Sequence, residues 1–306
     1  MIIALSGGIG GAKLALGLSR VLSPEELLII ANTGDDFEHY GLTICPDTDT
    51  LLYTLAGLDN PQLGWGRADE SWAFMQTLAG LGGADWFRLG DRDLALHVLR
   101  SHRLRAGEAL SAITDDLRQR FGIGPRILPM SDDPVRTRIG TDQGWLDFQD
   151  WFVRLRAEPL ARAVQFAGVE KARAQPALLD ALQAKPRGIV LCPSNPFISI
   201  EPILALPGLR DAIKASGAPV VAVSPIIAGQ AVKGPTARMF EALGITPSAA
   251  AVAARYGDLL HGYVMEEGDD ADGIVPRVFH AETLMRNLDD KMNLARQVLA
   301  AIDAIR

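Results

Sequence analysis

The chain begins with a short apolar segment that runs directly into a cluster of glycines. Residues 1–11 read MIIALSGGIGG, and Lys13 follows at the start of a segment with helical spacing of its apolar residues. A strand, a glycine loop and a helix in this order are typical of α/β folds that bind anions, because backbone amides converge at the helix N-terminus. We therefore expect a phosphate-binding loop that includes Gly7, Gly8, Gly10 and Lys13.

Neither standard form of such a loop is present. A Walker loop has glycine directly before its lysine and Ser or Thr after it, whereas Lys13 lies between Ala12 and Leu14. In the dinucleotide-binding fingerprint the third glycine would fall on Lys13. The segment thus predicts an anion without specifying which one. The alternative is a glycine turn needed only for close packing of the strand on the helix.

Apolar runs and helical segments alternate along the chain, which predicts an α/β fold with a Rossmann-like, mostly parallel sheet flanked by helices. Strands are expected in IIALSG and LLIIANTGDD, and later in IVLCPSNP, ending near Pro193, and in PVVAVSPII, ending near Ile226. The expected helices cover residues 13–22, 49–58 and 280–306, with a further helical wall between 71 and 120. The strand ends then place the ligand, because open α/β sheets bind ligands at the carboxyl ends of their strands.

The pattern changes between residues 135 and 168 to the alternation that is typical of antiparallel strands. A turn at 142–144 divides this segment, and RAVQFAG follows it. The 306 residues suggest about two domains at roughly 150 residues each. We predict a small β-rich insertion at 135–175, within a nucleotide-binding core formed by 1–134 and 176–306.

The composition argues against several classes of protein. A net charge of −7 without a long Lys/Arg run disfavours a nucleic-acid binder, which needs a basic surface. No apolar run approaches the roughly 18 residues that span a membrane, and no basic region precedes the first apolar segment, so we expect a cytoplasmic protein without a membrane segment. Two cysteines cannot form a four-cysteine zinc site, so a metal would bind oxygen ligands.

Two acidic clusters follow the second predicted strand. The first is NTGDD, which contains Asn32, Thr33 and Asp35, and the second is PDTDT, which contains Asp47 and Asp49. Carboxylates that converge beside a phosphate cradle suit Mg²⁺ shared with a diphosphate. We expect Asp35 and Asp47 to bind the metal. The alternatives are a helix cap for Asp47, and a turn or a ribose contact for Asp35.

Further polar clusters lie at predicted turns and at the ends of later strands. These are RLGDRD at 88–93, PMSDDP at 129–134, PSNP at 193–196, SPI at 224–226 and KGPT at 233–236. Capped turns and helix starts are the alternative interpretation of the first two clusters. His97 is expected to pack on the inner face of a helix. The predicted ligand contacts in these clusters are Asp91, Arg92, Ser131, Asp132, Ser194, Asn195, Ser224 and Gly234.

Taken in order, the motifs GGIGGAK, NTGDD, PDTDT, LGDRD, PMSDDP, PSNP, SPI and KGPT resemble the 2-phospho-L-lactate transferases of coenzyme F420 biosynthesis (CofD, with FbiA as the actinobacterial form). The resemblance implies a Mg²⁺-dependent transferase that moves a phospho-acid group from a guanosine diphosphate-activated donor to the ribityl hydroxyl of the deazaflavin Fo (7,8-didemethyl-8-hydroxy-5-deazariboflavin) and releases GMP. It also implies a homodimer. The donor acid, which is lactate, enolpyruvate or glycerate, stays open.

Carried over residue by residue, the resemblance places Asp49 and Arg88 at the deazaflavin. It places Asp35 and Asp47 near the metal and the diphosphate, and Asn32, Ser194 and Asn195 near the nucleotide. We hypothesise that Asp49 orients the attacking hydroxyl while Asp47 binds the metal, although these two roles could be exchanged. Ile9 stands where many relatives have Thr, which removes a hydroxyl but no backbone amide from the cradle.

Two other functions fit part of this pattern. A non-catalytic nucleotide-sugar-binding regulator of the same superfamily would share the glycine loop and the first aspartates, but LGDRD and PMSDDP argue against it. A nicotinamide-dependent dehydrogenase would also use a glycine loop, but the third fingerprint glycine is absent and PDTDT has no role in hydride transfer.

Overall fold

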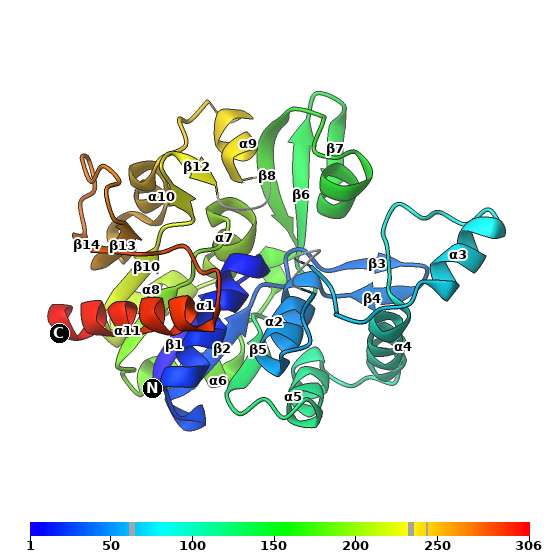
Figure 1. The fold of residues 1–306 in the computed structure, drawn as a ribbon, viewed down its shortest axis with the longest axis horizontal. Helices are drawn as coiled ribbons and strands as arrows, with labels where there is room; N and C mark the ends of the chain where they lie inside the picture. Colours follow the sequence, from blue (N-terminus) through cyan, green and yellow to red (C-terminus); the bar gives the residue numbers. More distant parts are fainter. Residues whose placement is uncertain (61–64, 232–235, 243) are drawn as a thin grey trace.

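A seven-stranded parallel sheet forms the centre of the computed structural model, which describes residues 1–60, 65–231, 236–242 and 244–306 (Figure 1). All six strand pairings are parallel. This confirms the predicted Rossmann-like α/β class. From one edge to the other the strands are β14 (Arg277–Ala281), β13 (Gly262–Glu266), β10 (Val220–Val223), β9 (Gly188–Leu191), β1 (Ile2–Ser6), β2 (Leu27–Ala31) and β5 (Arg126–Pro129).

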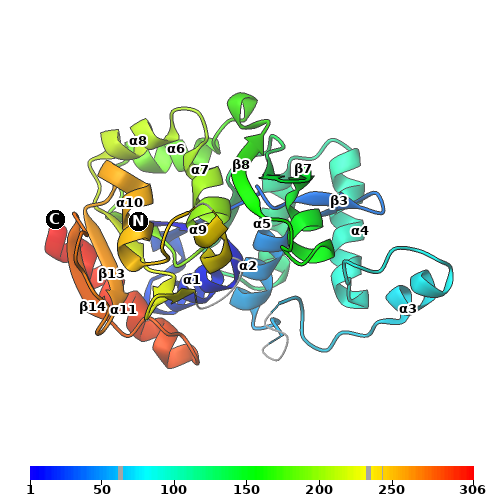
Figure 2. The ribbon, with the colours of Figure 1, turned by 90° about the horizontal axis from the view of Figure 1, so that it is seen from above.

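Helices cover both faces of the sheet, so its central strands are buried apolar runs (Figure 2). Successive side chains of β1 point to opposite faces: Ile3 and Leu5 belong to one core cluster, Ile2 and Ala4 to the other. The first cluster includes side chains of α6 (Pro176–Gln183), α8 (Leu209–Ser216) and α10 (Ala249–Tyr256). The second includes side chains of α1 (Gly8–Val21), α2 (Pro46–Ala56), α5 (Leu110–Arg120) and α11 (Leu288–Ile305).

Three helices start at residues other than those expected. Helix α1 begins at Gly8 rather than Lys13, because Gly7 is the N-cap and the glycines form the first turn. Helix α2 begins at Pro46, since proline fits the first helical position, so PDTDT occupies its first turns. Helix α11 begins only at Leu288, after an Asn287 capping box. Residues 280 and 281, assigned to this helix from the sequence, instead form the end of strand β14 (277–281).

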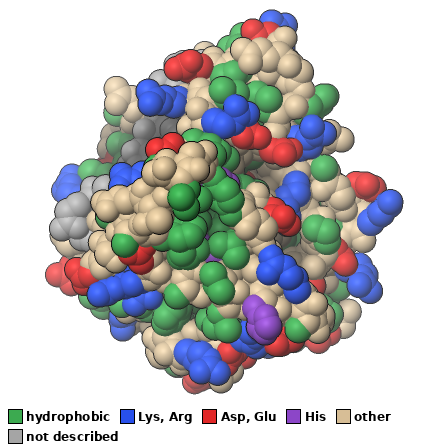
Figure 3. Space-filling view, turned by 90° about the vertical axis from the view of Figure 1, so that its right-hand side faces the viewer, with side chains coloured by type: hydrophobic (Ala, Val, Ile, Leu, Met, Phe, Trp, Pro, Cys, Tyr) green, Lys and Arg blue, Asp and Glu red, His purple; other side chains and the backbone are tan. Residues whose placement is uncertain are grey.

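The segment between 71 and 120 is helical as expected, but its helices do not all lie together. Helices α4 (Asp91–Arg105) and α5 follow one another, whereas α3 (Ala73–Gly80) lies on an arm away from the sheet, on the same side of the molecule as the hairpin β3 (Phe37–His39) and β4 (Leu42–Ile44) (Figure 1). Figure 3 views this side and shows hydrophobic side chains gathered near its centre. Residues 71–84 carry no charge, and Leu81 on the arm is 82% exposed.

The predicted β-rich insertion is present as a three-stranded antiparallel sheet. Its strands are β6 (Arg136–Thr141), β7 (Gly144–Asp147) and β8 (Ala161–Ala167), in the order β7-β6-β8. The turn between β6 and β7 falls at 142–143, where the sequence predicted it. A short helical segment, η2 (Asp150–Arg154), follows and buries Trp151. The domain limits at 134 and 176 stay a prediction.

Short elements complete the described chain. They are η1 (Pro24–Glu26), η3 (Val169–Lys171), η4 (Pro196–Ile200), α7 (Glu201–Leu204), β11 (Ile226–Ile227), β12 (Gln230–Ala231), α9 (Thr236–Ala242) and η5 (Gly257–Leu259). Of the helices described, none combines the length and the apolar character needed to cross a membrane.

Candidate functional site

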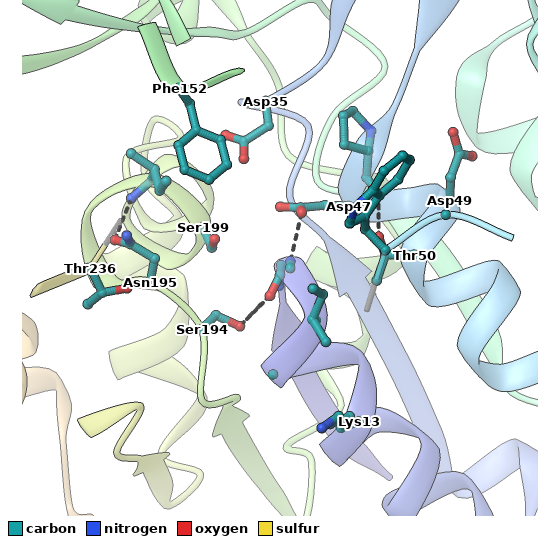
Figure 4. Close-up of a pocket in the computed structure, with 18 of the residues that line it drawn as sticks. Lys13, Asp35, Asp47, Asp49, Thr50, Phe152, Ser194, Asn195, Ser199 and Thr236 are labelled. Carbon is teal, nitrogen blue, oxygen red and sulfur yellow. Dashed lines mark hydrogen bonds between the residues drawn. The ribbon is translucent and has the colours of Figure 1, made fainter. Parts of the chain in front are cut away.

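A cavity of about 740 Å³ lies beyond the carboxyl ends of the central strands (Figure 4). It includes the place between β1 and β9 where the strand order reverses, which is where α/β sheets generally bind ligands. The chain segments that follow β1, β2, β9 and β10 all contribute to its wall. The predicted site residues that line it are Gly7, Gly8, Gly10, Lys13, Asp35, Asp47, Asp49, Arg88, Ser194, Asn195 and Ser224.

The glycine segment serves two purposes. Gly8 has a positive φ of +61°, which supports the predicted need for unusual backbone angles at this position. Gly7 has extended backbone, and it is needed for a different reason: a Cβ there would lie 2.6 Å from Asp47 Oδ2. Glycine is therefore required at Gly8 by the backbone angle and at Gly7 by the close approach of Asp47, while anion binding by this segment stays a prediction.

Asp47 is held by the start of α1 and by the end of β2. The Gly8 N–H donates to Asp47 Oδ1 at 2.7 Å, and the Asn32 side-chain amide donates to Asp47 Oδ2 at 2.8 Å. Asn32 also donates to the Ile198 carbonyl at 3.0 Å and accepts from the Gly34 N–H at 2.8 Å. It is fully buried and does not line the cavity. Asn32 thus positions Asp47, contrary to the predicted substrate contact, and Thr33 is likewise buried outside the cavity lining.

Asp35 and Asp47 face the same part of the cavity (Figure 4). Burial, followed by the charges of Asp47 and Asp36, raises the pKa of Asp35 well above its usual value. Burial likewise raises the pKa of Asp47 to about 6. Asp35 Oδ1 is buried without a hydrogen-bond partner. Two adjacent carboxylates with an unpaired oxygen suit Mg²⁺, which usually binds one or two carboxylates together with substrate phosphates.

The four carboxylates of NTGDD and PDTDT, which are Asp35, Asp36, Asp47 and Asp49, do not all converge on the cavity. Asp36 is 3% exposed and does not line the cavity; burial raises its pKa to about 7, partly offset by the nearby charge of Arg136. Asp49 does line the cavity, but its carboxylate points away from Asp47 (Figure 4). The convergence is therefore limited to Asp35 and Asp47.

Asp49 lies on α2 and forms a buried charge network with residues of α4. Both of its oxygens are bound by the Arg100 guanidinium, Nη1 to Oδ2 at 3.0 Å and Nη2 to Oδ1. His97 places Nδ1 3.6 Å from Asp49 Oδ2 and Nε2 3.2 Å from Asp93 Oδ2. The Tyr53 hydroxyl donates to Asp93 Oδ1 at 2.5 Å.

The same network has the residue types of a metal site. Asp49, Asp93 and His97 offer ligand atoms within 4.8 Å of one another. Because Arg100 already binds both oxygens of Asp49, we interpret these residues as charge-compensating partners rather than as a metal centre. His97 is buried as expected, but with Tyr53 and Asp93 it also lines the cavity, which sequence reasoning did not predict.

Besides Asn32 and Thr33, four further predicted contacts lie outside the cavity lining, and their polar groups have structural partners or face solvent. Asp91 accepts from the Ser71 hydroxyl and from backbone amides at the start of α3. Asp132 accepts from both the N–H and the hydroxyl of Ser111 at the start of α5. Ser131 accepts from the Asp133 N–H, and the Arg92 side chain is exposed. The helix-start and capped-turn alternatives describe these four residues, whereas Arg88 and Asp93 of the first cluster line the cavity.

The wall formed after β9 and β10 carries hydroxyl and amide groups. Ser194 Oγ accepts from the Gly7 N–H at 3.2 Å and donates to the Gly7 carbonyl at 2.7 Å. Asn195 Oδ1 accepts from the Phe197 N–H at the start of η4, and Ser224 Oγ donates to the Ile226 carbonyl. Gly234 lies outside the described residues. Lys13 Nζ donates to the Met285 carbonyl at 2.9 Å, which ties the start of α1 to the segment before α11.

Aromatic side chains form another part of the wall. Trp65, Trp86 and Phe87 come from the segments on either side of α3, and Arg88 stacks over the Trp72 ring at 4.2 Å. The insertion contributes Phe148 and Phe152, whose rings stack with centroids 5.4 Å apart. Sequence reasoning missed these aromatic residues and Ser199, because no local pattern directs them to a ligand. Thr236, the last residue of the KGPT cluster identified from the sequence, also lines the cavity.

Comparison with known proteins identifies the family. The model of the family described as 2-phospho-L-lactate transferase CofD matches residues 2–299. The chain belongs to the CofD family. This family member is 43% identical to a phosphoenolpyruvate transferase of Kitasatospora aureofaciens, with 100% of the chain and 98% of the relative covered. It is 41% identical to a phosphoenolpyruvate transferase of Streptomyces coelicolor, with 100% and 99% covered. The resemblance predicted from the motifs is confirmed.

A solved structure supports the fold of this CofD family member. A UPF0052 family protein of Bacillus halodurans matches it with a TM-score of 0.64 at 15% identity, covering 97% of this chain and 98% of the other. At this level of identity the similarity concerns the fold alone. It does not discriminate between a transferase and a nucleotide-binding regulator built on the same scaffold.

Proposed function

We propose that this CofD family member transfers a phospho-acid group from a guanosine diphosphate-linked donor to the ribityl hydroxyl of Fo, with release of GMP, in coenzyme F420 biosynthesis. The observation that carries the proposal is a single cavity with two kinds of wall. Backbone amides at the start of α1 and the Asp35–Asp47 pair suit a metal-bound diphosphate, whereas the aromatic side chains suit a flat ring system.

The proposed donor acid is enolpyruvate. The sequence alone left lactate, enolpyruvate and glycerate open. Relatives that match the whole chain at 41–43% identity are named phosphoenolpyruvate transferases, although the family description names 2-phospho-L-lactate. These acids differ by one oxygen or one double bond, so the choice rests on the relatives rather than on a particular contact.

Asp35 and Asp47 are the proposed ligands of Mg²⁺. The ion would neutralise charge on the diphosphate and on the departing GMP. In the transfer itself, a bond forms between the ribityl oxygen and the phosphorus that carries the acid, and the bond from that phosphorus to the bridging oxygen of GMP breaks. The hydroxyl proton leaves to a base or to water. Positioning and electrostatics supply most of the rate in such transfers.

Asp49 has a narrower role here than the one proposed from its position in the sequence. Its oxygens are bound by Arg100, which fixes the orientation of the carboxylate, but each oxygen retains a lone pair that can accept another hydrogen bond. We therefore propose that Asp49 accepts a hydrogen bond from the deazaflavin substrate, and that Arg88 contacts the same substrate. A homodimer also remains a proposal.

The test is mass spectrometry of reactions that contain the protein, Fo, Mg²⁺ and guanosine diphosphate adducts of enolpyruvate, lactate and glycerate, each supplied separately. We expect a new phosphodiester of Fo together with GMP, formed fastest from the enolpyruvyl adduct. Asp49→Asn should lower turnover strongly. Asp133→Asn is the control and should leave turnover unchanged, because the Asp133 carboxylate accepts a hydrogen bond from the Arg173 N–H and does not line the cavity. Binding of the adducts without any product would instead favour the non-catalytic regulator.

A further inference from the structure

Resting on the proposed function, we infer that the Asp47 carboxylate competes with the diphosphate for the Gly8 amide, and that metal binding resolves this competition by drawing Asp47 away. On this view Asp47 is more than a metal ligand: it links occupation of the metal site to opening of the anion site. The metal would then favour binding of the diphosphate to this cavity.

The first observation is the contact itself. The Gly8 N–H lies at the start of the 14-residue helix α1, where an anion is expected to bind, and it donates to Asp47 Oδ1 at 2.7 Å. One N–H cannot make two good hydrogen bonds to anions at the same time. A phosphate oxygen that takes this amide must therefore displace a carboxylate of the protein.

The second observation is the neighbouring carboxylate. Asp35 is 7% exposed, its Oδ1 has no hydrogen-bond partner, and it faces Asp47 across the same part of the cavity (Figure 4). A cation held by this buried oxygen would attract Asp47 as well. The metal site and the amide site thus share one side chain.

Asn32 defines how Asp47 can move. Its amide holds Asp47 Oδ2 at 2.8 Å and is itself fixed by the Ile198 carbonyl and the Gly34 N–H. In the part of the chain that the structure describes, the Gly8 N–H is the one hydrogen-bond donor to Asp47 Oδ1. The carboxylate can therefore rotate about the atom that Asn32 holds and release the Gly8 amide without losing its second anchor.

Competition can be separated from simple charge repulsion because the chain offers a matched control. Removing either Asp47 or Asp35 removes one negative charge from the site. Removing Asp47 also frees the Gly8 N–H, whereas removing Asp35 does not. Any additional gain in anion binding by the Asp47 variant measures the competition.

The experiment is isothermal titration of GDP into wild type, Asp47→Ala and Asp35→Ala, with and without Mg²⁺. Without Mg²⁺ we expect Asp47→Ala to bind GDP about tenfold more tightly than Asp35→Ala, the effect of one charge-assisted hydrogen bond. Mg²⁺ should tighten binding to wild type much more than to either variant. Equal affinities of the two variants without Mg²⁺ would overturn the inference, while failure of wild type to bind GDP with Mg²⁺ would overturn the proposed function as well.

A measurement on the wild-type chain avoids dependence on how the variants fold. Labelling with [1-¹³C]glycine and [¹⁵N]glycine selects Gly-Gly pairs, and the sequence contains only those at 7–8, 10–11 and 82–83. The Gly8 amide proton, deshielded by its carboxylate acceptor, should move upfield and exchange faster when Mg²⁺ alone is added. The 82–83 pair on the arm serves as the control. A Gly8 signal unchanged at saturating Mg²⁺ would overturn the inference.

Discussion

At the scale of single residues, Arg100 has the most demanding environment. Its side chain is 1% exposed, and its guanidinium binds both oxygens of Asp49, 51 residues earlier in the chain. Burial by itself would lower the pKa of Arg100, but the charge of Asp49 and its hydrogen bonds outweigh this, so the pKa is raised. Arg100 therefore stays charged although it is buried, and it depends on Asp49 for its charge compensation.

Replacing Arg100 should consequently destabilise the fold. Arg100→Met keeps much of the side-chain volume but leaves Asp49 as an uncompensated buried carboxylate, which costs about 3–5 kcal/mol. Urea unfolding measures the loss. Arg103→Ala is the control on the same helix, because Arg103 forms its ion pairs with Glu108 and Asp116 near the surface. Each such pair contributes at most about 1 kcal/mol. Equal losses for the two variants would show that Arg100 is not a structural anchor.

The paired carboxyl groups predict how metal binding depends on pH. The pKa of Asp47 is raised to about 6 and that of Asp35 is raised well above its usual value, in both cases chiefly by burial. A protonated carboxyl does not bind Mg²⁺, so each proton that must be displaced weakens binding about tenfold per pH unit below its pKa. Calorimetry should show the affinity for Mg²⁺ falling as the pH decreases through about 6. A constant affinity would contradict the assignment of these two ligands.

At the scale of elements, the packing of α1 against α11 depends on one glycine. A Cβ at Gly17 would lie 2.1 Å from the Lys291 carbonyl oxygen, which is backbone and cannot rotate away. Gly17→Ala must therefore push the helices apart and should lower the free energy of unfolding by about 1–3 kcal/mol.

The control uses the same substitution in a different helix. Gly80 ends α3, and a Cβ there would meet nothing within 4 Å. Gly80→Ala should leave stability unchanged or raise it by up to about 1 kcal/mol, because alanine restricts the unfolded chain. If thermal unfolding shows the two variants to be alike, the close approach of α1 and α11 is not required.

At the scale of the whole molecule, the cavity joins parts of the chain that are far apart in the sequence. Its wall includes the start of α1, the aromatic segments around α3, the insertion and the ends of β9 and β10. A ligand that contacts all of these stabilises the native state as a unit.

We expect GDP with Mg²⁺ to raise the melting temperature. Ligand at about 100 times its Kd stabilises the native state by about 2.7 kcal/mol, equivalent to roughly 4 °C for a chain of this size. GDP alone should give a smaller shift because Asp35 and Asp47 repel the diphosphate. Differential scanning fluorimetry measures both shifts, and a melting temperature unaffected by GDP with Mg²⁺ would contradict nucleotide binding in this cavity.

Local sequence patterns predicted some elements of this structure correctly and gave wrong assignments for others. The apolar run before the glycines predicted β1, and the alternation after residue 135 predicted the insertion. Strand β14 was not predicted, and its last two residues were assigned to the closing helix, because five residues are too few to show their own period beside a long helical segment. Asp132 was assigned to the site because an aspartate before a helix has the same local pattern whether it caps the helix or binds a ligand.

The sequence by itself determined the class of fold, the family and the end of the sheet at which the cavity lies, because strand periodicity, glycine spacing and the order of the motifs are local properties of the chain. Only the tertiary structure decided which carboxylates face each other. Asp47 and Asp49 are two positions apart at the start of α2, yet one points to Gly8 and the other to Arg100. Their directions depend on how α2 packs between α1 and α4, and no pattern within PDTDT contains that information.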